Sequence, residues 1–129
     1  MDSATKDKLL KWALILFGVI FLLVYPLAMV WPAGWQWHGG HGQYYFQMIC
    51  GIYATLGVFL ILASRAPAEH RSLIQFTIWS SIVHGAIMAG QAFSDTSEHG
   101  HFIGDVPALF LVAAVLWYLM PSQAKTVSA

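Results

Sequence analysis

The chain has 129 residues, of which 58% are apolar and only 9% are charged, and its formal net charge at neutral pH is zero. A soluble domain usually carries about 25% charged residues, so this composition excludes a water-soluble domain, and the high hydrophobicity excludes general disorder. The zero net charge offers no basic surface for nucleic acid. The single cysteine, Cys50, permits no intrachain disulfide.

Four long apolar runs predict an all-α integral membrane protein, built as a four-helix bundle. The runs cover 12–31, 44–63, 73–93 and 105–120, and we interpret residues 1–129 as one four-span domain. Each run approaches the length of about 20 mainly apolar residues that a spanning helix needs, and none shows the alternation typical of barrel strands. Pro26 predicts a kink in the first span, because its ring leaves the carbonyl of Leu22 without a hydrogen-bond donor.

The basic residues predict that both ends of the chain lie in the cytoplasm. All six of them fall in the N-terminal tail, the second connection or the C-terminal tail: Lys6, Lys8, Lys11, Arg65, Arg71 and Lys125. Because cytoplasmic segments are enriched in Lys and Arg, we expect an N-in, C-in topology in the bacterial inner membrane. The aromatic residues near the span ends, among them Trp35 and Trp37, are interpreted as an interfacial belt.

The third span carries a polar stripe that predicts a ligand pocket inside the membrane. His84 lies close to the middle of this span, where an ionisable side chain is costly, so we expect an uncharged ring turned toward the bundle interior. The pocket is completed by residues of the same helix and one residue of the second span: Thr77, Ser81, Met88, Gln91 and Gln47. The same stripe also fits interhelical hydrogen bonds that fix helix register, and both interpretations stay open.

The first and third connections carry a cluster of histidines and carboxylates. The candidate metal ligands are His38, His41, Glu98, His99, His101 and Asp105. Neutral imidazoles and carboxylates suit Zn²⁺ or Cu²⁺, so one hypothesis is a zinc or copper site. The alternative is a hydrated polar loop in which Asp105 only caps the fourth helix. Since both connections emerge at the same end of the bundle, we expect them to approach one another, with His38 or His41 near Glu98, His99 or His101.

Four stretches of the chain resemble a family of short bacterial four-helix membrane proteins of unknown function. The stretches are Met48–Tyr53, His70–Ile74, Trp79–His84 and Gly104–Leu109, and the resemblance runs from about Tyr44 to Pro121. It implies a location in the bacterial inner membrane, and it implies no particular activity.

These observations lead to one main hypothesis about function and two alternatives. The main hypothesis is a non-catalytic accessory or binding subunit with a polar site around His84; its partners are membrane lipid and either further copies of itself or a larger membrane complex. The first alternative is a small membrane oxidoreductase or a module that binds a quinone or another lipophile. The second is a metal-binding protein that uses the outer histidines. Because the chain has no P-loop and no nucleophile elbow, no reaction is assigned to it.

Overall fold

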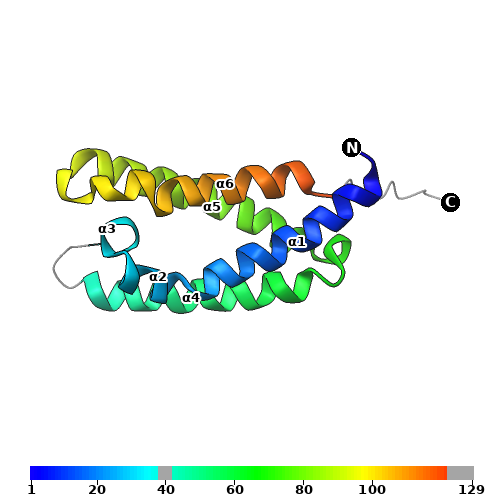
Figure 1. Ribbon diagram of the computed structural model, residues 1–129, viewed down its shortest axis with the longest axis horizontal. Helices are drawn as coiled ribbons and strands as arrows, with labels where there is room; N and C mark the ends of the chain where they lie inside the picture. The colour runs from blue at the N-terminus through cyan, green and yellow to red at the C-terminus, as the bar shows by residue number, and fades with distance from the viewer. Residues whose placement is uncertain (38–41, 122–129) are drawn as a thin grey trace.

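A computed structural model describes residues 1–37 and 42–121 of the chain, and all regular elements in these ranges are helical. The long helices are α1 (Ser3–Leu22), α4 (Gly42–Ala63), α5 (Arg71–Ser94) and α6 (Asp105–Leu119). The short ones are the α-helices α2 (Val24–Val30) and α3 (Pro32–Trp35) and the 3-10 helices η1 (Pro67–His70) and η2 (Thr96–Ile103). The expected all-α fold is therefore confirmed, and its long helices run lengthwise beside one another (Figure 1).

Three helical segments of the described chain are long and apolar enough to cross a membrane. They are Tyr44–Ala63, Pro67–Ser94 and Thr96–Leu119. A fourth crossing requires α1 and α2 together, because these helices are bent by 58° at the break between them. Pro26 explains the break: it has no N–H to donate to the carbonyl of Leu22, so regular helix stops at that point. The kink predicted in the first span is confirmed.

The long helices associate as two pairs. Helix α1 packs along α4, α5 packs along α6, and contacts between α1 and α6 join the two pairs. By contrast, α4 and α5 contact each other only sparsely, although they are consecutive in the chain. The close approach of α1 to α4 depends on Gly18 and Gly57, since a Cβ at Gly18 would lie only 2.7 Å from the carbonyl oxygen of Gly57. One side of the molecule is thus held much less tightly than the others.

The densest core lies in the half of the molecule that contains the N-terminus. Leucine and isoleucine side chains from all four long helices are fully buried there, among them Leu10, Leu60, Ile74 and Leu116. The other half holds only small buried clusters, such as the one around Met88. The 58° bend between α1 and α2 lies between these two halves.

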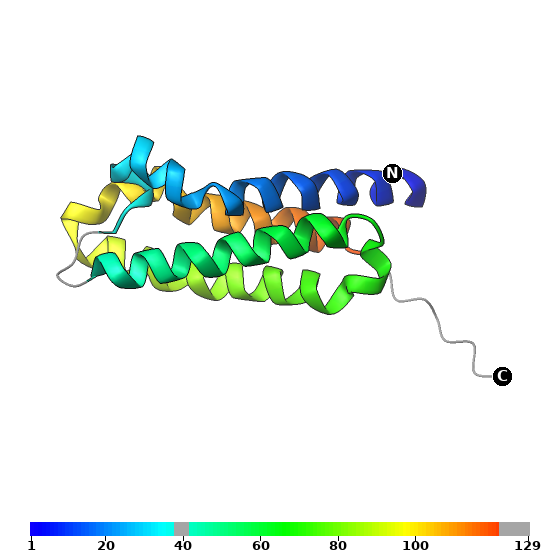
Figure 2. The same ribbon diagram turned by 90° about the horizontal axis from the view of Figure 1, so that it is seen from below.

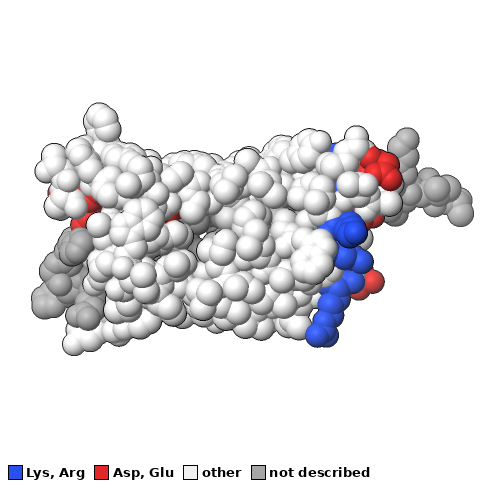
Figure 3. All heavy atoms as spheres, viewed as in Figure 1, with Lys and Arg blue, Asp and Glu red and all other residues white. Residues whose placement is uncertain are grey.

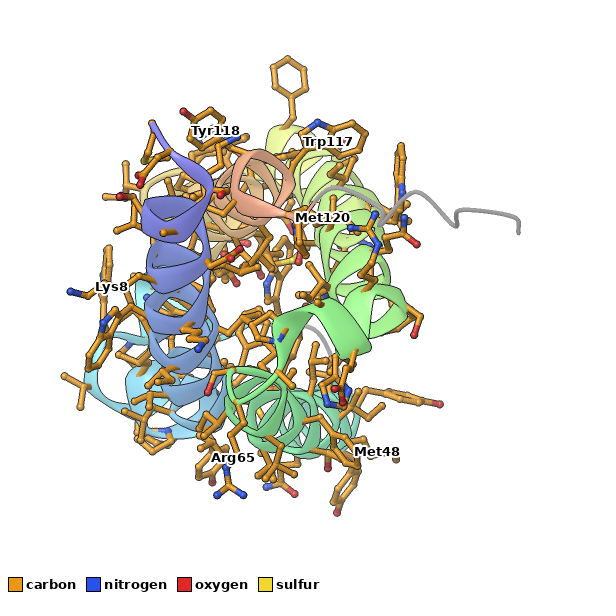
Figure 4. All side chains as sticks on the ribbon, turned by 90° about the vertical axis from the view of Figure 1, so that its right-hand side faces the viewer. Lys8, Met48, Arg65, Trp117, Tyr118 and Met120 are labelled. Carbon is orange, nitrogen blue, oxygen red and sulfur yellow. The ribbon has the colours of Figure 1, made fainter. Side chains whose placement is uncertain are left out.

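The two ends of the molecule differ in charge. The visible Lys and Arg side chains gather at one end (Figure 3), which also holds the N-terminus, η1 and the last turn of α6 (Figures 1 and 2). We call it the basic end; Figure 4 looks onto it and shows Lys8 and Arg65 pointing outward. At the opposite end, called the η2 end, the carboxylate of Asp95 accepts hydrogen bonds from the backbone N–H and hydroxyl of Ser97, which lower the pKa of Asp95.

The two connections at the η2 end contain the short helices α3 and η2, and they touch. Helix η2 packs against α3 so closely that the two backbones are in direct contact. A Cβ at Gly100 would clash with the carbonyl oxygen of Ala33, and one at Gly104 would clash with the carbonyl oxygen of Gly34. Within the described residues the two connections therefore meet, whereas the expected approach of His38 or His41 to the histidines and Glu98 of η2 falls outside them.

Candidate functional site

A cavity of about 120 Å³ lies in the less densely packed half, and every long helix contributes to its wall. Most of its lining is aromatic or aliphatic: Phe17, Ile20, Phe21, Val24, Trp35, Trp37, Phe46, Ile49, Tyr53, His84, Met88, Asp105, Ala108, Leu109, Leu111 and Val112. An apolar cavity of about 150 Å³ stays dry and binds benzene. The present cavity is somewhat smaller but is open at one side, so it can hold a single ring whose substituents project through the opening.

Tyr53 of α4 and His84 of α5 form the first polar part of the cavity wall. The Tyr53 hydroxyl and Nδ1 of His84 are hydrogen bonded, and the two rings stack with centroids 5.6 Å apart. Both side chains are half-buried, and Phe21 of α1 packs against the Tyr53 ring with a centroid distance of 5.1 Å. This pair bridges the one side of the molecule on which neighbouring helices make little contact.

The hydrogen bond leaves the pair with one unused polar position. If the Tyr53 hydroxyl donates to Nδ1, His84 carries its own proton on Nε2; in the other tautomer, Nδ1–H donates and the phenolic proton stays unused. In the part of the chain that the structure describes, Nε2 of His84 has no hydrogen-bond partner. The pair can therefore donate to, or accept from, one further polar atom, such as a carbonyl or hydroxyl oxygen of a ligand.

Asp105, at the start of α6, is the second polar residue in the wall. Its Oδ1 is 2.7 Å from Nδ1 of His101, and its Oδ2 accepts a hydrogen bond of 3.2 Å from the indole N–H of Trp37. His101 is fully buried, stacks on Trp37, and places Nε2 3.1 Å from Oε2 of Glu98 and 3.2 Å from the carbonyl oxygen of Gln36. Asp105 makes no capping hydrogen bond to α6, so the expectation that it only caps this helix is wrong.

Three of the candidate metal ligands lie together: His101 is hydrogen bonded to Asp105, and its Nε2 lies 3.1 Å from Oε2 of Glu98. Both ring nitrogens of His101 already face oxygen atoms, so neither is open to a metal ion. His99 is exposed, and its ring lies near Phe102. His38 and His41 lie outside the described residues. Within residues 1–37 and 42–121, no three side chains of His, Cys, Asp or Glu are placed to hold a metal ion.

The predicted ligand pocket coincides with the cavity only in part. His84 and Met88, one helical turn apart on α5, line the cavity. The other four predicted residues lie outside its lining: Thr77, Ser81, Gln47 and Gln91. The two hydroxyl residues are buried, and Thr77 satisfies its hydroxyl by donating to the carbonyl of Leu73 within the helix, whereas the two glutamines are exposed.

Sequence reasoning misses several residues of the cavity wall. It assigns no role to Tyr53, although a phenol in the middle of a predicted span is expected to need a hydrogen-bond partner there, and this need is the signal that could have identified it. It places Trp35 and Trp37 in the interfacial belt, whereas both line the cavity and Trp37 binds Asp105. The short helix α3, packed on η2, brings these two indoles over the end of the cavity.

The comparison with known proteins places the chain in a family and assigns no activity. No curated protein and no solved structure matches it. One family model, described as a family of unknown function (DUF6632), matches residues 4–128. The match extends the resemblance expected for residues 44–121 toward both ends of the chain, and it includes all residues that line the cavity. The chain belongs to the DUF6632 family, and the resemblance to a family of unknown function is confirmed.

Proposed function

We propose that the chain is a four-helix bundle that crosses the bacterial inner membrane four times, with both termini in the cytoplasm. In this topology α1 and α2 form one bent span, which the joint length and apolar character of the two helices support. The basic end faces the cytoplasm because cytoplasmic segments retain Lys and Arg, and the η2 end faces outward. The cavity then lies within the outer half of the membrane.

Within this bundle we propose that the protein is a non-catalytic binding protein for a small lipophile. The observation that supports this function is the Tyr53–His84 pair, which brings one unused polar position to the wall of a largely apolar cavity. The apolar lining favours a hydrophobic body, and aromatic side chains such as Phe17 and Phe21 offer faces against which a planar ring packs. The polar pair favours a single carbonyl or hydroxyl oxygen on that ring.

The ligand class that fits these features is a substituted ring with at least one hydrogen-bonding oxygen, and quinone head groups are members of this class. The loose side between α4 and α5 supports entry from the lipid, because few backbone contacts need to separate there. A ligand oxygen at the Tyr53–His84 pair would satisfy a polar group that is otherwise half-buried without a second partner, and leaving such a group unsatisfied is unfavourable.

Binding of duroquinone, a fully substituted benzoquinone, tests the proposal. Trp35 and Trp37 line the cavity, so duroquinone bound there should quench tryptophan fluorescence of the protein in lipid nanodiscs. Tyr53→Phe removes one oxygen, and we expect it to weaken binding roughly two- to tenfold, as the loss of one hydrogen bond predicts. Tyr118→Phe is the matched control, because Tyr118 is exposed on α6 and lies on the outside of the molecule (Figure 4).

A second pair of variants tests the cavity itself. Ala108→Phe places a ring into the cavity and should abolish saturable quenching, whereas Ala114→Phe adds the same ring to an exposed position of the same helix and should not. Durene, which has the same methylated ring without the oxygens, should compete weakly. If Tyr53→Phe and Ala108→Phe bind duroquinone as the wild type does, the quinone is only dissolved in the lipid and the proposal fails.

A further inference from the structure

A second feature, at the basic end, is the guanidinium group of Arg71. Arg71 begins α5 and is half-buried, and its Nη1 atom is buried with no hydrogen-bond partner among the described residues. Glu69, two residues earlier, is exposed and forms no salt bridge with it within that part of the chain. A buried guanidinium nitrogen that lacks an acceptor is unfavourable. An anionic acceptor from outside the chain would remove this cost.

Arg71 lies in a groove between α5 and α6. The groove has a volume of about 420 Å³ and is also lined by Gln75, Trp79, Trp117 and Met120. The two indoles meet edge to face with centroids 5.8 Å apart, and they are 55% and 61% exposed. Figure 4 shows Trp117 and Met120 at this end of α6. The groove therefore combines a cation near the end of the molecule with an exposed aromatic surface.

We infer that this groove binds an anionic phospholipid, with the phosphate on Arg71 and the upper acyl chains against Trp79 and Trp117. A guanidinium group can form two parallel hydrogen bonds with phosphate oxygens. The amide of Gln75, one turn along the same helix face, supplies a further donor. Basic pockets between membrane helices on the cytoplasmic side suit anionic lipid head groups. This inference rests on the membrane topology of the proposed function and is independent of the ligand of the cavity.

Native mass spectrometry of the detergent-purified chain, titrated with phosphatidylglycerol, tests the inference. The wild type should retain one phosphatidylglycerol molecule that Arg71→Gln binds at least roughly tenfold more weakly, since a charge-assisted contact is lost. Arg71→Lys keeps the charge but lacks the planar guanidinium group with its paired donors, so its affinity for phosphatidylglycerol should fall between those of the wild type and Arg71→Gln. Arg65→Gln is the matched control, because Arg65 is an exposed cation at the same end, and it should bind as the wild type does.

Two further arms identify the source of the phosphate. Phosphatidylcholine, whose head group has no net charge, should bind more weakly than phosphatidylglycerol, and inorganic phosphate should not displace the lipid. Unchanged affinity in Arg71→Gln would overturn the inference, as would equal binding of the two lipids or displacement by inorganic phosphate alone. Arg71→Gln should still bind duroquinone normally, so failure of the lipid site and failure of the cavity proposal are distinguishable.

Discussion

Replacement of His101 by leucine removes the imidazole ring that joins Asp105 to Glu98 at the η2 end. In the wild type, this ring is fully buried and has a carboxylate oxygen on each side, at 2.7 Å from Nδ1 and 3.1 Å from Nε2. Leucine occupies a comparable volume and still packs against Trp37, but it offers no N–H group. Asp105 then keeps only the hydrogen bond from Trp37. The substitution therefore tests the polar network with little change in packing.

The expected loss is large because little water reaches these groups. Asp105 is 8% exposed and Glu98 is 3% exposed, so solvent cannot replace the missing ring. Removal of one partner, which leaves a buried polar group without its hydrogen bond, costs about 1–3 kcal/mol, and we expect His101→Leu to lower the free energy of unfolding by that amount. His99→Leu is the matched control: His99 is exposed two residues away, and a surface substitution changes stability by about 0.5 kcal/mol or less.

Unfolding in mixed micelles of increasing dodecyl sulfate fraction, followed by helical circular dichroism, measures both variants. Adding Asp105→Asn to His101→Leu should recover part of the loss, because it removes a buried charge that has lost a partner. If His101→Leu costs no more than His99→Leu, or if the double variant is no more stable than His101→Leu, the polar contacts of His101 do not stabilise this end of the molecule.

Two further predictions concern packing and topology. Gly100→Ala should lower the thermal midpoint measured by circular dichroism, because the new Cβ clashes with the carbonyl oxygen of Ala33. Gly90→Ala is the control and should be neutral or stabilising by about 1 kcal/mol, since no atom lies within 4 Å of its Cβ position. Equal changes of the thermal midpoint in the two variants would contradict the close packing of η2 on α3. In a cysteine-free background, Thr96→Cys should react with an impermeant maleimide on intact cells and Ala68→Cys only after permeabilisation, and the reverse pattern would exclude the N-in, C-in topology.

The site could be predicted from the sequence only as far as one helix determines it. The helical period identifies Met88 as a neighbour of His84, and the cost of a polar ring inside a membrane predicts that His84 turns inward. The partner of His84 could not be predicted, because Tyr53 belongs to another helix and meets His84 only at one relative rotation of α4 and α5. The rotation of the helices also decides the position of Gln47 and Gln91. Both share a helix with cavity residues, but both are exposed.

The sequence by itself determined the features that depend on contiguous residues: the long apolar helices, the break near Pro26 and the collection of Lys and Arg in the N-terminal tail and the second connection. These follow from local hydropathy and from backbone hydrogen bonding within one helix. Only the tertiary structure decided that Asp105 binds His101 and Trp37 and that a cavity lies beside Tyr53. Those contacts depend on how far the helices rotate about their axes and how closely their backbones approach, and both quantities are set by packing between segments that are distant in the chain.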